Sequence, residues 1–247
     1  MKQSIEFIGQ YFLLMKRVFT KPDKGRLFWR QVVVEMDKLG FSSVLLIGII
    51  SLAIGAVLVI QTAYNLENPF IPKMYVGYMV RESLILEFSC TMVALILAGT
   101  VGSKIASEIG TMRLTEQIEA MEMMGINSAN YLIFPKVIAC CVFNPFILIF
   151  SFIVGICGGW LITALTGMIT IDQFVTGLRF AFNGFYIVYA ITKMVVYSFL
   201  IVTVSAFFGY RPKGSSMEVG KAGTRAIVIT CMLILVSDLL ITQLMLN

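Results

Sequence analysis

Histidine is absent from this chain of 247 residues, and charged residues make up only 13% of it. The first absence removes the side chain that most often binds metals and acts as a general base at neutral pH. The second excludes an ordinary soluble domain, in which about a quarter of the residues are charged. Because 58% of the residues are apolar and the mean hydropathy is +0.90, the sequence predicts an integral membrane protein with little soluble mass.

Motifs that carry chemistry are also missing. The five cysteines lie in apolar runs without a C-x-x-C pair, which favours small buried side chains over a zinc site or a disulfide framework. The stretch from Gly99 to Lys104 has the wrong spacing for a phosphate-binding loop, and no nucleophile–base set is visible. We therefore expect no enzyme activity, metal or cofactor in this chain. We also expect no signal peptide, because the first apolar run begins near residue 42.

Five apolar regions are long enough to cross a hydrocarbon core about 30 Å thick, which predicts an all-α membrane protein. Basic residues concentrate in alternate connections, with fifteen in segments 1–41, 102–136 and 209–225 and three in the opposite loops. By the positive-inside rule, the N-terminus and segment 102–136 are cytoplasmic and the C-terminus lies outside. The predicted spans are Ser42–Tyr64, Leu84–Val101, one within Tyr131–Leu165, Phe185–Phe208 and Ala226–Leu246.

The third apolar region is longer than one span requires. It contains Pro135 and Pro145, which predict either a kink near residues 143–145 or a tilted helix. It also carries a G-x-x-x-G motif from Gly155 to Gly159, which permits close helix packing within the chain or between two copies.

Residues 1–41 are predicted to form two interfacial helices ahead of a permease domain at 42–247. Apolar residues recur at spacings of three and four in the first helix, and basic residues lie off this stripe. A Lys-Pro-Asp-Lys-Gly stretch separates it from a second helix, 26–39, which is predicted to end at Gly40. Trp29 and the basic residues suit the headgroup level of a membrane. The alternative is that these helices are soluble and pack on a partner.

Three ionisable residues, Glu87, Lys193 and Asp238, fall inside predicted spans. A charge is costly in hydrocarbon, so each is expected to face a helix interface or a wet cavity. All three lie at similar depth toward the outer side, which permits pairing. They form either a polar site on a substrate path or an ion pair that joins helices, and a proton relay is a third interpretation.

The polar segment 103–126 connects spans two and three. It consists mainly of helix-forming residues, and Gly125 is a plausible stop. Its apolar residues fall on two roughly opposite faces, one containing Ile109 and the other Ile118. This pattern favours two short helices broken near Gly110, or one helix contacted on two sides by its own protein and by a partner. A solvated connecting helix is the alternative.

The same segment carries a family resemblance. Two neighbouring stretches closely resemble the MlaE (YrbE-type) family, the permease subunits of phospholipid-transporting ABC systems that work with MCE proteins: Glu108-Ile-Gly-Thr-Met-Arg-Leu-Thr-Glu-Gln-Ile-Glu-Ala-Met-Glu-Met-Met-Gly125 and Tyr131-Leu-Ile-Phe-Pro-Lys136. Segments 97–103, 210–214 and 219–225 are also similar to that family. The resemblance covers roughly residues 30–247.

The resemblance implies a phospholipid permease in the bacterial inner membrane. It implies a homodimer that binds two cytoplasmic ATPase subunits, and these subunits bind ATP and Mg. It also implies an MCE-domain protein on the outer face and, in some systems, a STAS-domain subunit on the ATPase. Lipid would move between the inner membrane and an MCE conduit to the outer membrane, which maintains outer-membrane lipid asymmetry. No nucleic acid is implied as a partner.

The resemblance also assigns roles to residues. A coupling helix at 105–125 would contact the ATPase through Glu108, Gly110, Thr111, Met112, Arg113, Thr115, Glu116, Gln117, Glu119, Ala120, Met121 and Gly125. The family often shows R-E-[L/F]-x-P near the outer end of span two. Here Glu87 is kept, whereas Leu86 and Cys90 replace the arginine and the proline, so this helix is expected to be straighter. Arg81 lies five residues upstream of Leu86.

A mechanism follows as a hypothesis. Two copies would enclose an amphipathic cavity, with acyl chains against Val57, Leu58, Gln61 and Tyr64 and the headgroup near Glu87, Lys193 and Asp238. ATP binding by the partner would move segment 105–125 and reshape the dimer. One rival is a secondary transporter that uses the three intramembrane charges, and another is a membrane scaffold for soluble partners.

Overall fold

The computed structural model describes residues 2–20, 25–66, 70, 72–211 and 215–246, and this part of the chain consists of helices and short connections, with no β-strand. The elements are α1 (Lys2–Val18), α2 (Gly25–Asn65), α3 (Met74–Ser83), the π-helical η1 (Leu84–Met92), α4 (Val93–Leu97), the π-helical η2 (Ala98–Gly102), α5 (Ser103–Leu114), α6 (Gln117–Met123), α7 (Ser128–Thr166), α8 (Ile171–Arg179), α9 (Phe185–Gly209) and α10 (Ser216–Leu246).

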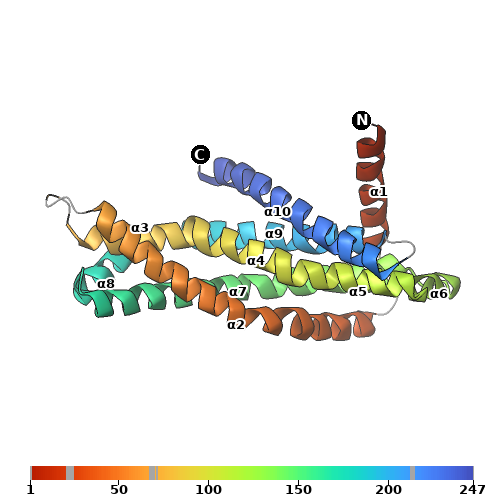
Figure 1. Ribbon diagram of the computed structural model, residues 1–247, viewed down its shortest axis with the longest axis horizontal. Coiled ribbons are helices and arrows are strands. Elements are labelled where there is room, and N and C mark those ends of the chain that lie inside the picture. The colour runs from red at the N-terminus through yellow and green to blue at the C-terminus, as the bar shows by residue number, and fades with distance from the viewer. Residues whose placement is uncertain (1, 21–24, 67–69, 71, 212–214, 247) are drawn as a thin grey trace.

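Five helical segments of the described chain are long and apolar enough to cross a membrane, which confirms the predicted number. They are Ser43–Asn65, Met74–Leu114, Ser128–Thr166, Phe185–Gly209 and Ser216–Leu246. Figure 1 shows α2, α7, α9 and the continuous rod from α3 to α5 running along one long axis. The short α6 lies at one end of this axis, and α3 and α8 lie at the other.

Helix α1 stands across the long axis at the α6 end (Figure 1). The Asn130 side chain, at the start of α7, donates hydrogen bonds to the carbonyls of Val18 at 2.6 Å and Thr20 at 2.7 Å. The Tyr11 hydroxyl donates to Thr203 of α9 at 2.9 Å, and burial raises the pKa of Tyr11. These contacts fix α1 to α7 and α9. Its placement in the membrane interface stays a prediction.

The predicted helix end at Gly40 is wrong, because α2 continues through this residue to Asn65. A Cβ atom at Gly40 would lie 2.1 Å from the ring of Phe143 on α7, so the glycine allows close helix packing there. The neighbouring Leu39 is buried in the core. Such tertiary contacts outweigh a helix-propensity cost of about 1 kcal/mol for glycine.

The glycines between Gly155 and Gly159 of α7 pack within the chain. A Cβ atom at Gly55 of α2 would lie 1.8 Å from the carbonyl oxygen of Gly155, and one at Gly158 would lie 2.1 Å from the carbonyl oxygen of Leu52. Helices α2 and α7 therefore meet backbone to backbone, which only residues without a side chain permit. Both Pro135 and Pro145 lie inside α7, which is one continuous helix.

The second span is not uniformly α-helical. It contains η1 and η2, where the backbone winds with wider π-helical turns. The absence of a proline at Cys90 therefore does not produce a regular α-helix here. Segments of π-helix occur often at functional sites, and η1 carries Glu87.

Candidate functional site

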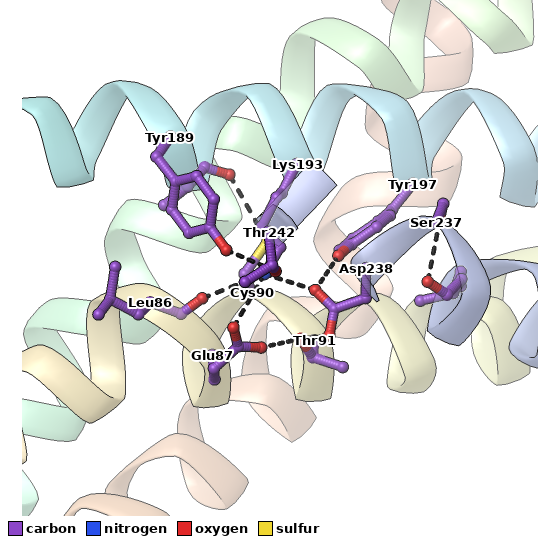
Figure 2. Close-up of polar contacts among 12 residues, drawn as sticks. Leu86, Glu87, Cys90, Thr91, Tyr189, Lys193, Tyr197, Ser237, Asp238 and Thr242 are labelled. Atoms are coloured by element: carbon purple, nitrogen blue, oxygen red, sulfur yellow. Dashed lines mark hydrogen bonds and ion pairs between the residues drawn. The ribbon is translucent and has the colours of Figure 1, made fainter. Parts of the chain in front are cut away.

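The three intramembrane charges meet between the second, fourth and fifth spans (Figure 2), an arrangement that their similar depth permits. The Lys193 ammonium on α9 is fully buried and lies 3.2 Å from Glu87 Oε1 of η1. It also pairs with the carboxylate of Asp238 on α10. A buried cation is tolerated when it is paired and hydrogen-bonded, so this arrangement satisfies Lys193.

Neighbouring polar side chains complete the cluster. The Tyr197 hydroxyl donates to Asp238 Oδ1 at 2.6 Å, and the Thr91 hydroxyl lies 3.5 Å from both carboxylates. The Lys193 ammonium lies 4.6 Å from the centre of the Tyr189 ring. Sequence reasoning missed Thr91 and both tyrosines. Their spacing was the available signal, because each lies four residues from a charged member and so shares its helix face.

The cluster is not equally enclosed on all sides. The side chain of Glu87 is 44% exposed, whereas that of Asp238 is 14% exposed. The cluster carries two carboxylates and one ammonium, so its formal charge is negative. Glu87 is therefore the member through which another molecule can reach this charge.

Three of the four predicted acyl-chain residues share an exposed face of α2. Val57 and Tyr64 are each 58% exposed, and Gln61 is exposed between them. Leu58 is a correction, because it is buried in a cluster that includes Phe174 of α8. One residue along a helix turns the side chain by about 100°, so Leu58 points inward where Val57 points outward.

Segment 103–126 forms two helices, but the break is not at Gly110. It falls at Thr115 and Glu116, where Glu116 has φ 56°. Gly110 instead packs against α10, since a Cβ atom there would lie 2.8 Å from Val219. The predicted stop at Gly125 is confirmed: its φ is 77°, and the following N–H donates to the Met121 carbonyl at 3.0 Å, as in a Schellman cap.

The two apolar faces of this segment both contact the chain itself. Ile105 and Ile109 are fully buried, as expected for one face, but Ile118 on the other face is fully buried too. The expectation that the second face is left for a partner is therefore wrong. The large apolar side chains that α6 and its C-cap expose are Met123, at 90%, and Met124, at 68%.

The predicted coupling residues differ in exposure. Glu108 is turned toward Lys136, and Arg113 forms an ion pair with Glu119 at 2.8 Å across the helix break. Met112 and Met121 pack partly against the core, and Gly110 is buried. The exposed members of the set are Thr111, Thr115, Glu116, Gln117, Ala120 and Gly125.

Comparison with known proteins decides the family. The sequence model of the family described as Permease MlaE matches residues 32–244. The chain belongs to the MlaE permease family. This confirms the resemblance seen in segment 108–136. With five candidate spans, this MlaE-family member is a multi-pass membrane protein, a non-catalytic permease of the ABC transporter type.

Individual relatives are similar to this MlaE-family chain over nearly its whole length. A probable ABC transporter permease protein of Rickettsia bellii is 30% identical over 96% of this chain and 91% of the relative. Another from Synechocystis is 31% identical over 95% of this chain and 89% of the relative. The intermembrane phospholipid transport system permease protein MlaE of Haemophilus influenzae is 29% identical over 99% of this chain and 95% of the relative.

Arg81 does not replace the arginine that this MlaE-family chain lacks at position 86. Its guanidinium is buried and donates to the carbonyls of Leu178 at 2.7 Å and Phe180 at 2.8 Å. It also pairs with Glu82 at 2.5 Å. Arg81 therefore closes the C-terminal end of α8 against α3, and its side chain is too deeply buried to meet a lipid headgroup.

Arg81→Met is expected to lower the thermal midpoint of the purified protein in detergent. The substitution removes the donor of two partly buried hydrogen bonds, at a cost of about 1–3 kcal/mol. Intrinsic-fluorescence melting measures the change, with Arg179→Met as the control, because Arg179 is exposed at the same end. Equal midpoints for the two variants would contradict the structural role of Arg81.

Proposed function

We propose that this protein is the permease subunit of an ABC-type phospholipid transporter that exchanges lipid between the inner membrane and an MCE-domain conduit to the outer membrane. Such a system maintains outer-membrane lipid asymmetry. The observation that carries the proposal is the paired cluster of Glu87, Lys193 and Asp238 inside the spans of an MlaE-family chain. Ionisable groups inside membrane spans are rare, and substrate pathways are one of the functional sites where they occur. The name of the Haemophilus relative agrees with a phospholipid cargo.

The proposed substrate site has a polar and an apolar part. The exposed face of α2 with Val57, Gln61 and Tyr64 would receive acyl chains. The half-exposed carboxylate of Glu87 would meet the headgroup, with Lys193 and Asp238 behind it. Leu58 has no place in this site, because it is buried.

A homodimer would enclose this site. Only 11% of the most apolar stretch of α10 is buried, whereas 33% to 56% of the corresponding stretch is buried in each of the other four spans. Figure 1 shows α10 leaving the bundle toward its C-terminus. Its exposed side chains there include Leu239 and Leu244, at 73% and 81%. A second copy that packs on this face would cover them and complete a cavity next to Glu87.

We place the α6 end of the molecule in the cytoplasm and the C-terminus in the periplasm. The basic residues gather in the segments at the α6 end, in keeping with the positive-inside rule. At this end α6 would contact a cytoplasmic ATPase, which binds ATP and Mg. A STAS-domain subunit on that ATPase belongs to the same proposal, as does an MCE-domain protein at the opposite end.

Isolation of the complex from native membranes tests the proposal. We expect two copies of this chain to purify with an ATPase and an MCE-domain protein, and we expect phospholipid in the organic extract. In proteoliposomes, lipid should move to the MCE protein only when ATP is supplied. A complex without phospholipid would contradict the cargo, and transport without any ATPase would favour a secondary transporter.

The exposed methionines of α6 and its C-cap, Met123 and Met124, give a sharper prediction. Met123→Asp combined with Met124→Asp is expected to weaken ATPase binding about 100-fold, because two exposed methionines lose the gain of burial at the interface. Quantitative co-purification or biolayer interferometry measures the change. Met168→Asp is the control, since Met168 lies in the connection from α7 to α8 at the far end. Unchanged binding in the double variant would exclude α6 as the coupling contact.

A further inference from the structure

A second ionic cluster, around Lys136, lies nearer the α6 end of the long axis than the cluster around Lys193. The ammonium of Lys136 on α7 lies 2.7 Å from Glu35 Oε2 of α2 and 2.7 Å from Glu108 Oε2 of α5. The Lys136 side chain is only 2% exposed, so both ion pairs are shielded from solvent on the lysine side. Charge-assisted hydrogen bonds of this length are strong, and here they join three helices at one atom.

The Glu108 side of this cluster belongs to the segment proposed to contact the ATPase. Helix α5 packs closely on two neighbours: a Cβ atom at Gly209 of α9 would lie 2.7 Å from the Ala106 carbonyl oxygen, and Gly110 packs on Val219 of α10. After the break at Glu116, the chain continues directly into α6. A displacement of α6 would therefore act on α5, and through Glu108 on Lys136.

Glu35 lies on α2, the same helix that carries the proposed acyl-chain face. Glu35 and Lys136 join α2 to α7 at the α6 end, and the same two helices meet backbone to backbone at Gly55 and Gly155. From Glu35 to Val57 the helix rises about 33 Å, at about 1.5 Å per residue. With contacts near both ends of this distance, α2 and α7 form a paired unit that extends from the ionic cluster to the exposed α2 face.

We propose that Lys136 is a positioning residue that transmits movement of α5 and α6 to the α2–α7 pair, and so links ATP hydrolysis by the partner to lipid movement. The inference rests on the proposed function, since it requires the ATPase partner. An ammonium on a four-carbon stem has three donors, so it can keep both carboxylates while the helices shift relative to one another. Close-packed apolar contacts do not tolerate such a shift.

Lipid moved per ATP hydrolysed is the decisive measurement, made on the complete complex with its ATPase in proteoliposomes. Glu35→Gln removes one of the two ion pairs of Lys136, and Glu35 lies on α2 rather than on α5 or α6. We expect ATP hydrolysis to change less than about twofold and lipid per ATP to fall about tenfold, in line with coupling energies of this kind. Lys136→Met should have the same effect, and Lys136→Arg should restore most of the transport, because arginine can also pair with two carboxylates.

Asp37→Asn is the matched control, since Asp37 is an exposed acid two residues from Glu35 on the same helix. Lipid per ATP at the wild-type level in Glu35→Gln and Lys136→Met would overturn the role of Lys136 and leave the transporter proposal intact. If Lys136→Met fails to assemble, the milder Glu35→Gln decides alone. If the wild-type complex moves no lipid with ATP, the proposed function fails, and the inference fails with it.

Discussion

Lys193→Met is expected to abolish ATP-dependent phospholipid transport and to lower the thermal midpoint of the complex. The substitution leaves the carboxylates of Glu87 and Asp238 facing each other inside the membrane without a cation. Removal of one partner from a buried ion pair costs about 3–5 kcal/mol. Proteoliposome transport and melting in detergent measure the two effects. Thr91→Val is the control, because it removes a hydroxyl from the same cluster and changes no charge.

A neutral triple variant separates a role of the cluster in lipid binding from a role in joining helices. Glu87→Gln, Lys193→Met and Asp238→Asn together remove every charge of the cluster, and replacement of a whole buried ion pair is often neutral for stability. If the cluster takes part in lipid binding, the triple variant should recover the wild-type midpoint without recovering transport. Recovery of both would show that the charges serve only to join helices. Wild-type transport in Lys193→Met alone would contradict either role.

Gly55→Ala is expected to prevent the accumulation of folded protein. Even a Cβ atom at this position would lie 1.8 Å from the Gly155 carbonyl oxygen, so α2 and α7 must separate where their backbones meet. Overpacking in a close-packed core costs about 1–3 kcal/mol for added methylenes between side chains, and rigid backbone contacts cannot relax in this way. Yield after membrane extraction and elution on size exclusion measure the outcome.

Gly99→Ala is the matched control for that experiment. Gly99 also lies in a membrane-spanning helix, but a Cβ atom there meets nothing within 4 Å. We expect this variant to accumulate like the wild type, with a small gain in helix stability of about 0.5–1 kcal/mol. Normal yield and elution of Gly55→Ala would contradict the backbone contact between α2 and α7.

Local patterns predicted several features correctly. The five spans follow from composition alone, because apolar runs of about 20 residues form helices that satisfy their own backbone hydrogen bonds within hydrocarbon. The meeting of Glu87, Lys193 and Asp238 follows from similar depth, since each charge must find a partner there. The stop at Gly125 follows from the left-handed conformation that glycine adopts readily.

Other glycines do not have the role that the sequence predicted, because glycine occurs both at helix ends and at close helix contacts. Gly40 and Gly110 were expected to interrupt helices, but each lies inside one and faces a neighbouring side chain. The break between α5 and α6 instead falls at Glu116, which carries no glycine signal. Which of the two uses applies depends on the neighbouring helix, which is absent from the local pattern.

The sequence by itself determined the class of the protein, its number of spans and its family, since each of these follows from local composition or from one continuous motif. The tertiary structure alone decided that Leu58 and Ile118 face inward and that Lys136 joins Glu35 to Glu108. In a chain that is apolar on most faces, periodicity does not separate lipid-facing from protein-facing residues. Only the packing of helices distant in the sequence makes that distinction, so the inward position of Leu58 and the Lys136 cluster emerged from the fold.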